Sequence, residues 1–115
     1  MRVFTILIIC VAALVSGCQH EALVSRLDRL DGLTEAQVIA RFGKPTRLAE
    51  FPMSKAQSEF RAALQQYHPL PASRDVQIHE LTWEQPKVYI TVWLHETIST
   101  WRVFDSLRYG KDVVF

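Results

Sequence analysis

Cysteine is scarce in this chain of 115 residues, which contains only Cys10 and Cys18. Small exported domains commonly depend on several disulfides, but Cys10 lies in an N-terminal run that we expect to be removed, so we predict no disulfide in the mature protein. The sequence also lacks a surplus of either charge, with 13 Lys and Arg against 12 Asp and Glu. A nucleic-acid-binding domain normally carries a basic stripe, so the composition argues against a nucleic-acid partner. The hydrophobic content of 49% indicates a globular domain rather than a disordered chain.

The sequence has no apolar run long enough to cross a bilayer. After Met1 and Arg2, the segment Val3–Val15 is apolar except for Thr5, whereas a spanning helix needs roughly 20 residues. A positive start followed by a short apolar run is typical of a signal peptide. We therefore expect this segment to target the protein for export and then to be removed.

The apolar run ends in "VSGCQ", which resembles the lipobox of bacterial lipoproteins. The matching residues are Val15, Ser16, Gly17 and Cys18. The resemblance implies that the Cys18 thiol first receives diacylglycerol and that the chain is then cleaved at the peptide bond before Cys18. It also implies that the new N-terminus then gains a further acyl chain such as palmitate. The alternative is an ordinary signal peptide with a chance cysteine. Because Gln19 replaces the aspartate that commonly marks retention in the inner membrane, the resemblance implies an outer-membrane anchor facing the periplasm.

These features divide the chain into three predicted parts. Residues 1–17 are the lipoprotein signal peptide, residues 18–31 are a lipid-anchored tether or short helix, and residues 32–115 are a single α+β domain. Several acyl chains hold a protein on a bilayer because each buried methylene contributes about 0.8 kcal/mol.

Two helices are predicted in the first half of the domain. Thr34 and Gln37 have the spacing of a capping box, and Gly43 followed by Pro45 is a helix stop signal, so we predict a helix over 34–42. A second helix is predicted over 54–67, where Phe60, Leu64 and Tyr67 lie on one stripe.

After residue 74 the sequence becomes rich in β-branched and aromatic residues. The segments 76–84, 87–95 and 99–109 are predicted strands, with turns around Gln85-Pro86, Glu96-Thr97 and Gly110-Lys111-Asp112. Helices followed by strands indicate an α+β fold. We predict two or three short N-terminal helices packed on one face of a three-stranded antiparallel sheet.

The segment "GLTEAQVIARFGKPT" resembles the start of the BamE (SmpA/OmlA) family of small outer-membrane lipoproteins. The residues that carry the resemblance are Gly32, Leu33, Thr34, Gln37, Val38, Gly43 and Pro45. The resemblance implies a fold of two helices against a three-stranded sheet, and a role near the machine that inserts β-barrels into the outer membrane. The chain departs from the family pattern between Leu48 and Asp75, where a helix and a proline-rich linker stand in place of an early strand.

The sequence contains few residues in a pattern typical of a catalytic or metal-binding site. The dipeptides His79-Glu80 and His95-Glu96 would form a metal site only if their strands brought them together, and no recognised ligand spacing is present, so we predict no metal and no other cofactor. No Gly-x-Ser-x-Gly motif and no free cysteine remains as a nucleophile. We therefore predict no catalytic residues and no enzymatic activity.

The last sequence feature is a group of strand aromatics. The candidate interaction residues are Trp83, Tyr89, Trp93, Trp101 and Tyr109. On a small sheet most of these would be core, and the rest would form an exposed patch for a protein partner. Our first hypothesis is a lipid-anchored, non-enzymatic interaction module with an envelope protein partner, in its narrowest form an accessory of β-barrel assembly. The alternative is a small binding or inhibitor lipoprotein whose ligand is an envelope enzyme, a lipid or a peptidoglycan fragment.

Overall fold

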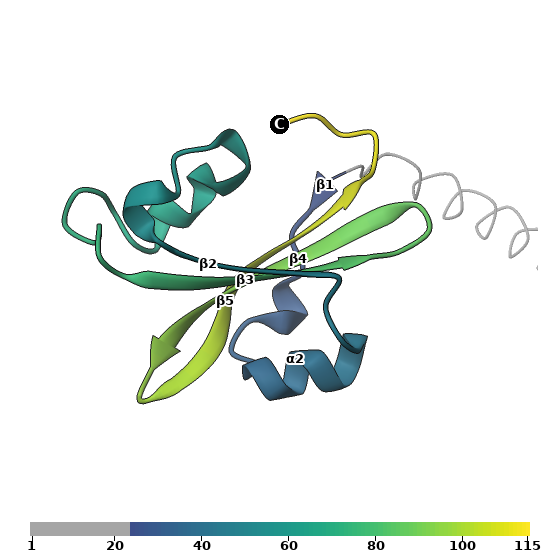
Figure 1. Ribbon diagram of the computed structural model, residues 1–115, viewed down its shortest axis with the longest axis horizontal. Coiled ribbons are helices and arrows are strands. Elements are labelled where there is room, and N and C mark those ends of the chain that lie inside the picture. The colour runs from purple at the N-terminus through teal and green to yellow at the C-terminus, as the bar shows by residue number, and fades with distance from the viewer. Residues whose placement is uncertain (1–23) are drawn as a thin grey trace, which may run out of the picture.

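A computed structural model describes residues 24–115, which form a five-stranded antiparallel sheet with helical segments on both faces (Figure 1). The strand order is β1-β5-β4-β3-β2. The elements are β1 (Val24–Ser25), the 3₁₀ segment η1 (Asp28–Leu30), α2 (Glu35–Phe42), β2 (Arg47–Pro52), the 3₁₀ segments η2 (Met53–Lys55) and η3 (Glu59–Gln66), β3 (Gln77–Glu84), β4 (Val88–Thr97) and β5 (Thr100–Gly110). The predicted signal peptide, the lipobox and Cys18 lie outside the described residues.

The three long strands form the centre of the sheet. β3 pairs with β4 through a tight turn in which the Gln85 N–H donates to the Val88 carbonyl at 2.9 Å. β4 pairs with β5 over its whole length, with one bulge between Trp93 and Leu94. The three strands predicted from their β-branched and aromatic residues are confirmed, except that the β4–β5 turn falls at Ile98-Ser99 instead of Glu96-Thr97.

α2 covers one face of the sheet, and its predicted caps are confirmed. The Thr34 hydroxyl accepts from the Gln37 N–H, and the Gln37 side chain accepts from the Thr34 N–H at 2.9 Å. Gly43 has a φ of 85°, which favours glycine, and its N–H donates to the Ile39 carbonyl. Val38 is fully buried in a cluster with residues of η1 and the three central strands.

η2 and η3 cover the opposite face, as Figure 1 shows. Met53, Ala56 and Leu64 are buried there against Ile78, Trp93 and Phe104. The predicted helix over 54–67 is therefore two short 3₁₀ segments. The N–H groups of Met53 and Ser54 donate to the carbonyls of Val76 and Arg74, which ties η2 to the loop before β3. The capping residue of η3 is Ser58, whose hydroxyl accepts from the Arg61 N–H.

The predicted fold is wrong in two respects. The sheet has five strands instead of three, and the helical segments lie on both faces instead of one. The described part of the chain is mostly β, with α2 as its one regular α-helix. The helical segments separate because β2 lies between them in sequence and forms the edge of the sheet, so the chain passes around that edge.

Two edge strands account for the difference in strand number. β2 buries only Phe51, since one of its faces is largely open and Leu48 is 69% exposed. A strand with so little buried surface gives almost no alternation signal. β1 consists of two residues that pair with Tyr109 and Arg108 of β5, which is too short for any pattern.

Candidate functional site

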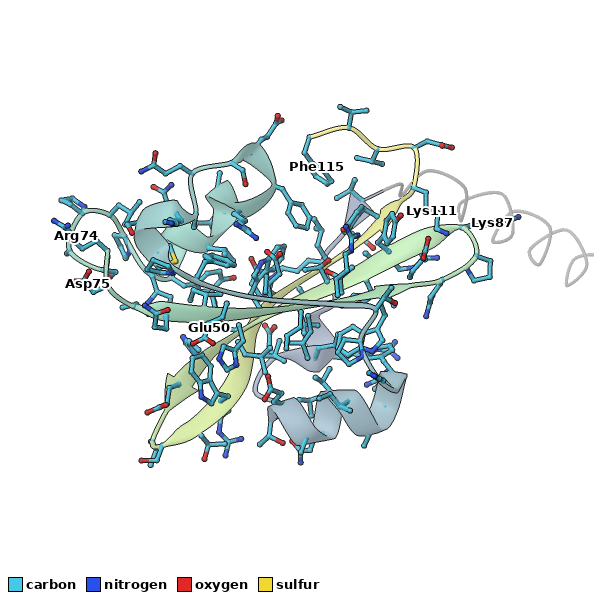
Figure 2. The ribbon with its side chains drawn as sticks, viewed as in Figure 1. Glu50, Arg74, Asp75, Lys87, Lys111 and Phe115 are labelled. Carbon is cyan, nitrogen blue, oxygen red and sulfur yellow. The ribbon has the colours of Figure 1, made fainter. Side chains whose placement is uncertain are left out.

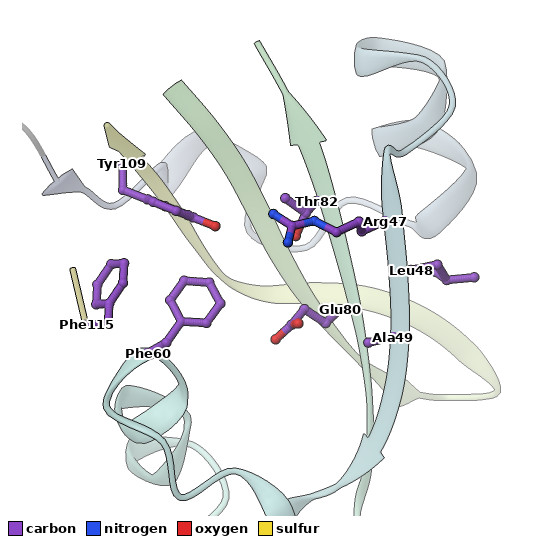
Figure 3. Close-up of a pocket in the computed structure, with 8 residues that line it drawn as sticks. All are labelled: Arg47, Leu48, Ala49, Phe60, Glu80, Thr82, Tyr109 and Phe115. Carbon is purple, nitrogen blue, oxygen red and sulfur yellow. The ribbon is translucent and has the colours of Figure 1, made fainter. Parts of the chain in front are cut away.

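A cleft of about 650 Å³ opens between the sheet and η3 (Figure 3). Its lining residues come from β2, β3, η3, β5 and the tail after β5, and they are Arg47, Leu48, Ala49, Phe60, Glu80, Thr82, Tyr109 and Phe115. Figure 3 shows the Leu48 side chain pointing away from the other seven, so β2 presents Arg47 and Ala49 to the cleft. The volume lies within the usual range for small-molecule sites.

The sheet wall of the cleft is polar. Neighbouring strands place Ala49 opposite Glu80 and Arg47 opposite Thr82. The Thr82 hydroxyl lies 2.9 Å from that of Thr91, which lies 3.3 Å from the Tyr109 hydroxyl. This chain of hydroxyls can both donate and accept, so it can adapt to a polar group of a ligand.

The carboxylate of Glu80 is buried and fully engaged. Arg61 donates to its two oxygens at 2.8 and 2.9 Å, and the indole N–H of Trp93 donates at 2.7 Å. The Arg61 guanidinium also lies 3.8 Å from the centre of the Phe51 ring. Since a buried charge needs such partners, Glu80 fixes η3 to the sheet and is not available as a general base.

The opposite wall is aromatic. Phe60 of η3 lies with its ring centre 5.3 Å from that of Tyr109 and 5.0 Å from that of Phe115. Phe115 also contacts Tyr109 edge-on at 5.4 Å, so the tail folds back over the sheet (Figure 2). These rings give the cleft an apolar wall facing the polar one.

The five candidate interaction aromatics have mostly structural positions. Trp83, Trp93 and Tyr109 are 4%, 2% and 9% exposed, while Tyr89 and Trp101 are half-buried. Trp83 donates to the Gly43 carbonyl at 2.8 Å and packs on Phe42, which holds α2 on the sheet. Of the five, Tyr109 alone lines the cleft, so these aromatics do not form one continuous exposed patch.

The helix–turn motif also has a structural position. Thr34 and Gln37 cap α2, Val38 is buried, Leu33 packs against the same cluster, and Gly32 and Gly43 both have a φ of 85°. Pro45 follows in the connection to β2. None of the seven motif residues lines the cleft.

The two His-Glu dipeptides lie apart. His79 stacks on Trp101 at 3.5 Å and lies 3.2 Å from Glu35, on the α2 face. His95 lies with its Nδ1 2.8 Å from the Nε2 of His68 and stacks on Phe104, on the η3 face. Among residues 24–115 no group of three potential metal ligands comes together.

The His68–His95 pair is partly shielded from water. Burial lowers the pKa of His68. Burial, and secondarily the neighbouring charge of His68, lowers the pKa of His95. The two rings therefore favour the neutral state in the folded protein.

Sequence reasoning missed most of the cleft. The helix predicted over 54–67 places Phe60 on its apolar stripe, which predicts core packing, and Arg47 belongs to β2, which has no alternation signal. Phe115 is far from both in sequence. No local pattern joins these three segments, because the fold of the tail and of η3 brings them together.

No family model, no curated protein and no solved structure matches this chain. The resemblance to the BamE family therefore stays a prediction that rests on residues 32–45. Across residues 24–115, every helix is too short or too polar to span a bilayer.

Proposed function

We propose that this protein is a lipid-anchored, non-enzymatic binding protein of the bacterial envelope. It is held in the outer membrane by acyl chains on Cys18 and faces the periplasm. Its ligand is a small amphipathic molecule bound in the cleft between the sheet and η3. The observation that carries the proposal is the cleft itself, in which the rings of Phe60, Tyr109 and Phe115 lie beside the polar side chains of Arg47 and Thr82.

The two walls define the ligand class. Phe60, Tyr109 and Phe115 suit an apolar or aromatic body. Arg47 is exposed and suits a carboxylate or another acceptor at the mouth. Neither histidine nor cysteine is present among the described lining residues, and the carboxylate of Glu80 is engaged by Arg61 and Trp93. These features support binding over catalysis.

The anchor would hold the binding site close to the membrane surface. Acyl chains on Cys18 confine the domain to a thin layer at the membrane, which raises its effective concentration toward membrane-bound donors or acceptors of the ligand. A lipid or a peptidoglycan fragment fits both the layer and the amphipathic cleft.

Blocking the cleft tests the proposal. Ala49→Trp places a large ring into the cleft from β2, while Leu48→Trp places the same ring on the side that points away, so it is the matched control. The full chain, purified from envelopes in a neutral detergent, is extracted with organic solvent and the extract is analysed by mass spectrometry. We expect a small molecule with wild type and Leu48→Trp and its loss with Ala49→Trp. Equal recovery from all three would contradict the cleft as the site.

A second candidate function is favoured by the free edge of β2. Leu48 is exposed at that edge, and an edge strand can pair with a strand of a partner. This supports the scaffold hypothesis, whose narrowest form is an accessory of β-barrel assembly. Co-purification of barrel-assembly subunits with wild type, and their loss with Leu48→Lys while Ala49→Trp retains them, would favour this candidate over the first.

A further inference from the structure

A second cleft, of about 460 Å³, lies on the α2 face of the sheet and is lined by four arginines. They come from four segments: Arg26 follows β1, Arg29 is in η1, Arg41 is in the last turn of α2 and Arg108 is in β5. The other lining residues that the structure describes are apolar and belong to the core cluster under α2 or pack against it; they are Leu27, Leu30, Phe42 and Ile90. The cleft thus combines a cationic rim with an apolar floor.

Arg26 is held in place by carboxylates. Its Nε donates to Asp105 at 2.9 Å and its Nη2 donates to Asp31 at 2.6 Å. Asp105 is 6% exposed and also accepts from the Ser106 N–H. The charge of Arg26 is therefore balanced, and this residue serves as a fixed wall of the cleft.

The other three arginines have no such balance. Arg29, Arg41 and Arg108 are exposed, and none of them forms an ion pair with an acidic side chain that the structure describes. Arg41 lies near the C-terminal end of α2, where a cation is favourable. That explanation does not apply to Arg108 in β5 or to Arg29 in a three-residue segment, so the helix end does not explain their convergence.

We propose that this arginine cleft binds a phosphate ester that carries an apolar substituent. A guanidinium group pairs with phosphate oxygens in a bidentate geometry, and a concave site lined by one sign of charge concentrates counter-ions. Three cations without an ion pair to any described carboxylate exceed the charge of one ligand carboxylate and suit a phosphate dianion. Leu30, Phe42 and Ile90 would contact the substituent.

Two sources could supply this chemistry, a phospholipid headgroup of the membrane or a soluble phosphate ester. Neither source requires that Cys18 be lipidated, and neither involves the cleft beside η3. The inference is therefore independent of the proposed function, and Ala49→Trp should leave phosphate binding unchanged.

Calorimetric titration of the full chain in neutral detergent micelles tests the inference. The probes are hexyl phosphate, inorganic phosphate and hexanol, the last as the uncharged control. The variants are Arg29→Gln and Arg108→Gln, made singly and together, and Arg74→Gln in the loop before β3 is the matched control (Figure 2). Because all three arginines are exposed, the variants should keep the wild-type melting temperature.

We expect hexyl phosphate to bind saturably and more tightly than inorganic phosphate, and hexanol not to bind. The double variant should lose about tenfold or more in affinity, since hydrogen bonds to charged groups are the stronger class, while Arg74→Gln should match wild type. Displacement of hexyl phosphate by phosphatidic acid in the micelle assigns the site to a headgroup, and failure of that displacement assigns it to a soluble ester. Equal binding of hexanol, or wild-type affinity in the double variant, would overturn the inference.

Discussion

Glu80 shows how one residue supports the cleft. Its side chain is 11% exposed and that of Arg61 is 25% exposed, so the pair is shielded from water but not fully buried. Together with Trp93, the pair joins η3 to β3 and β4. Removing Glu80 leaves a guanidinium and an indole N–H without their acceptor.

We expect Glu80→Ala to lower the free energy of unfolding by about 2–4 kcal/mol, the lower part of the range reflecting the exposure of Arg61. Chemical denaturation of the full chain measures this value. Glu96→Ala, at an exposed position of β4, is the control and should change stability by less than about 0.5 kcal/mol. A Glu80→Ala effect as small as the control would show that the network does not stabilise η3.

The His68–His95 pair makes a pH prediction at the same scale. Both pKa values are lowered from 6.5 in the folded state, so the unfolded chain binds more protons below that pH. The contribution of the two histidines to the free energy of unfolding is therefore fully present above pH 6.5 and is lost as the pH falls below it.

Urea unfolding at about pH 7.5 and about pH 5.5 measures this decline. His68→Gln removes one titrating ring and keeps a polar side chain beside His95, so the variant should lose less stability than wild type between the two values. An equal or greater loss in the variant would contradict the assignment of the effect to this pair.

The β4–β5 hairpin carries strain at the scale of an element. Ile98 and Ser99 have φ values of 52° and 61°, a conformation in which a β-branched residue is unfavourable. Two-residue hairpin turns of this kind prefer Asn-Gly. Ile98 is 95% exposed, so its replacement removes no packing.

We expect Ile98→Asn combined with Ser99→Gly to raise the free energy of unfolding by about 1 kcal/mol. The measurement is the denaturation midpoint at constant slope. Ser99→Ala removes the hydroxyl without relieving the backbone and should give no gain. A loss of stability in the Asn-Gly variant would show that the turn is not strained as described.

The elements also show what the sequence could predict. α2 has a capping box, a closing glycine and a proline within one short segment, so its signals are local and sufficient. β3, β4 and β5 are rich in β-branched and aromatic residues, because both faces of these central strands lie against packed layers. β2 and η2 have no such local signal, since their positions depend on pairing with β3 and on contacts with the loop before it. The cleft could not be predicted for the same reason, because its lining residues come from segments that are far apart in the sequence.

For the whole molecule, we propose an anchor of acyl chains on Cys18. Cys18→Ala should move the protein from the membrane fraction to the soluble fraction, because each lost acyl methylene removes about 0.8 kcal/mol of membrane affinity. Fractionation of envelopes and the mass of the N-terminal peptide are the two measurements. An unmodified Cys18 in wild type, or membrane retention of a variant whose N-terminal peptide begins at residue 18, would rule out lipidation as the anchor.

The proposed site for a small molecule is the cleft between the sheet and η3. The most direct measurement is the melting temperature of the full chain with and without the molecule extracted from envelopes. At about tenfold above its Kd, the molecule should raise the melting temperature of wild type and Leu48→Trp by about 5 °C or more, and leave Ala49→Trp unchanged. An equal rise in Ala49→Trp, or no rise in wild type, would contradict the claim.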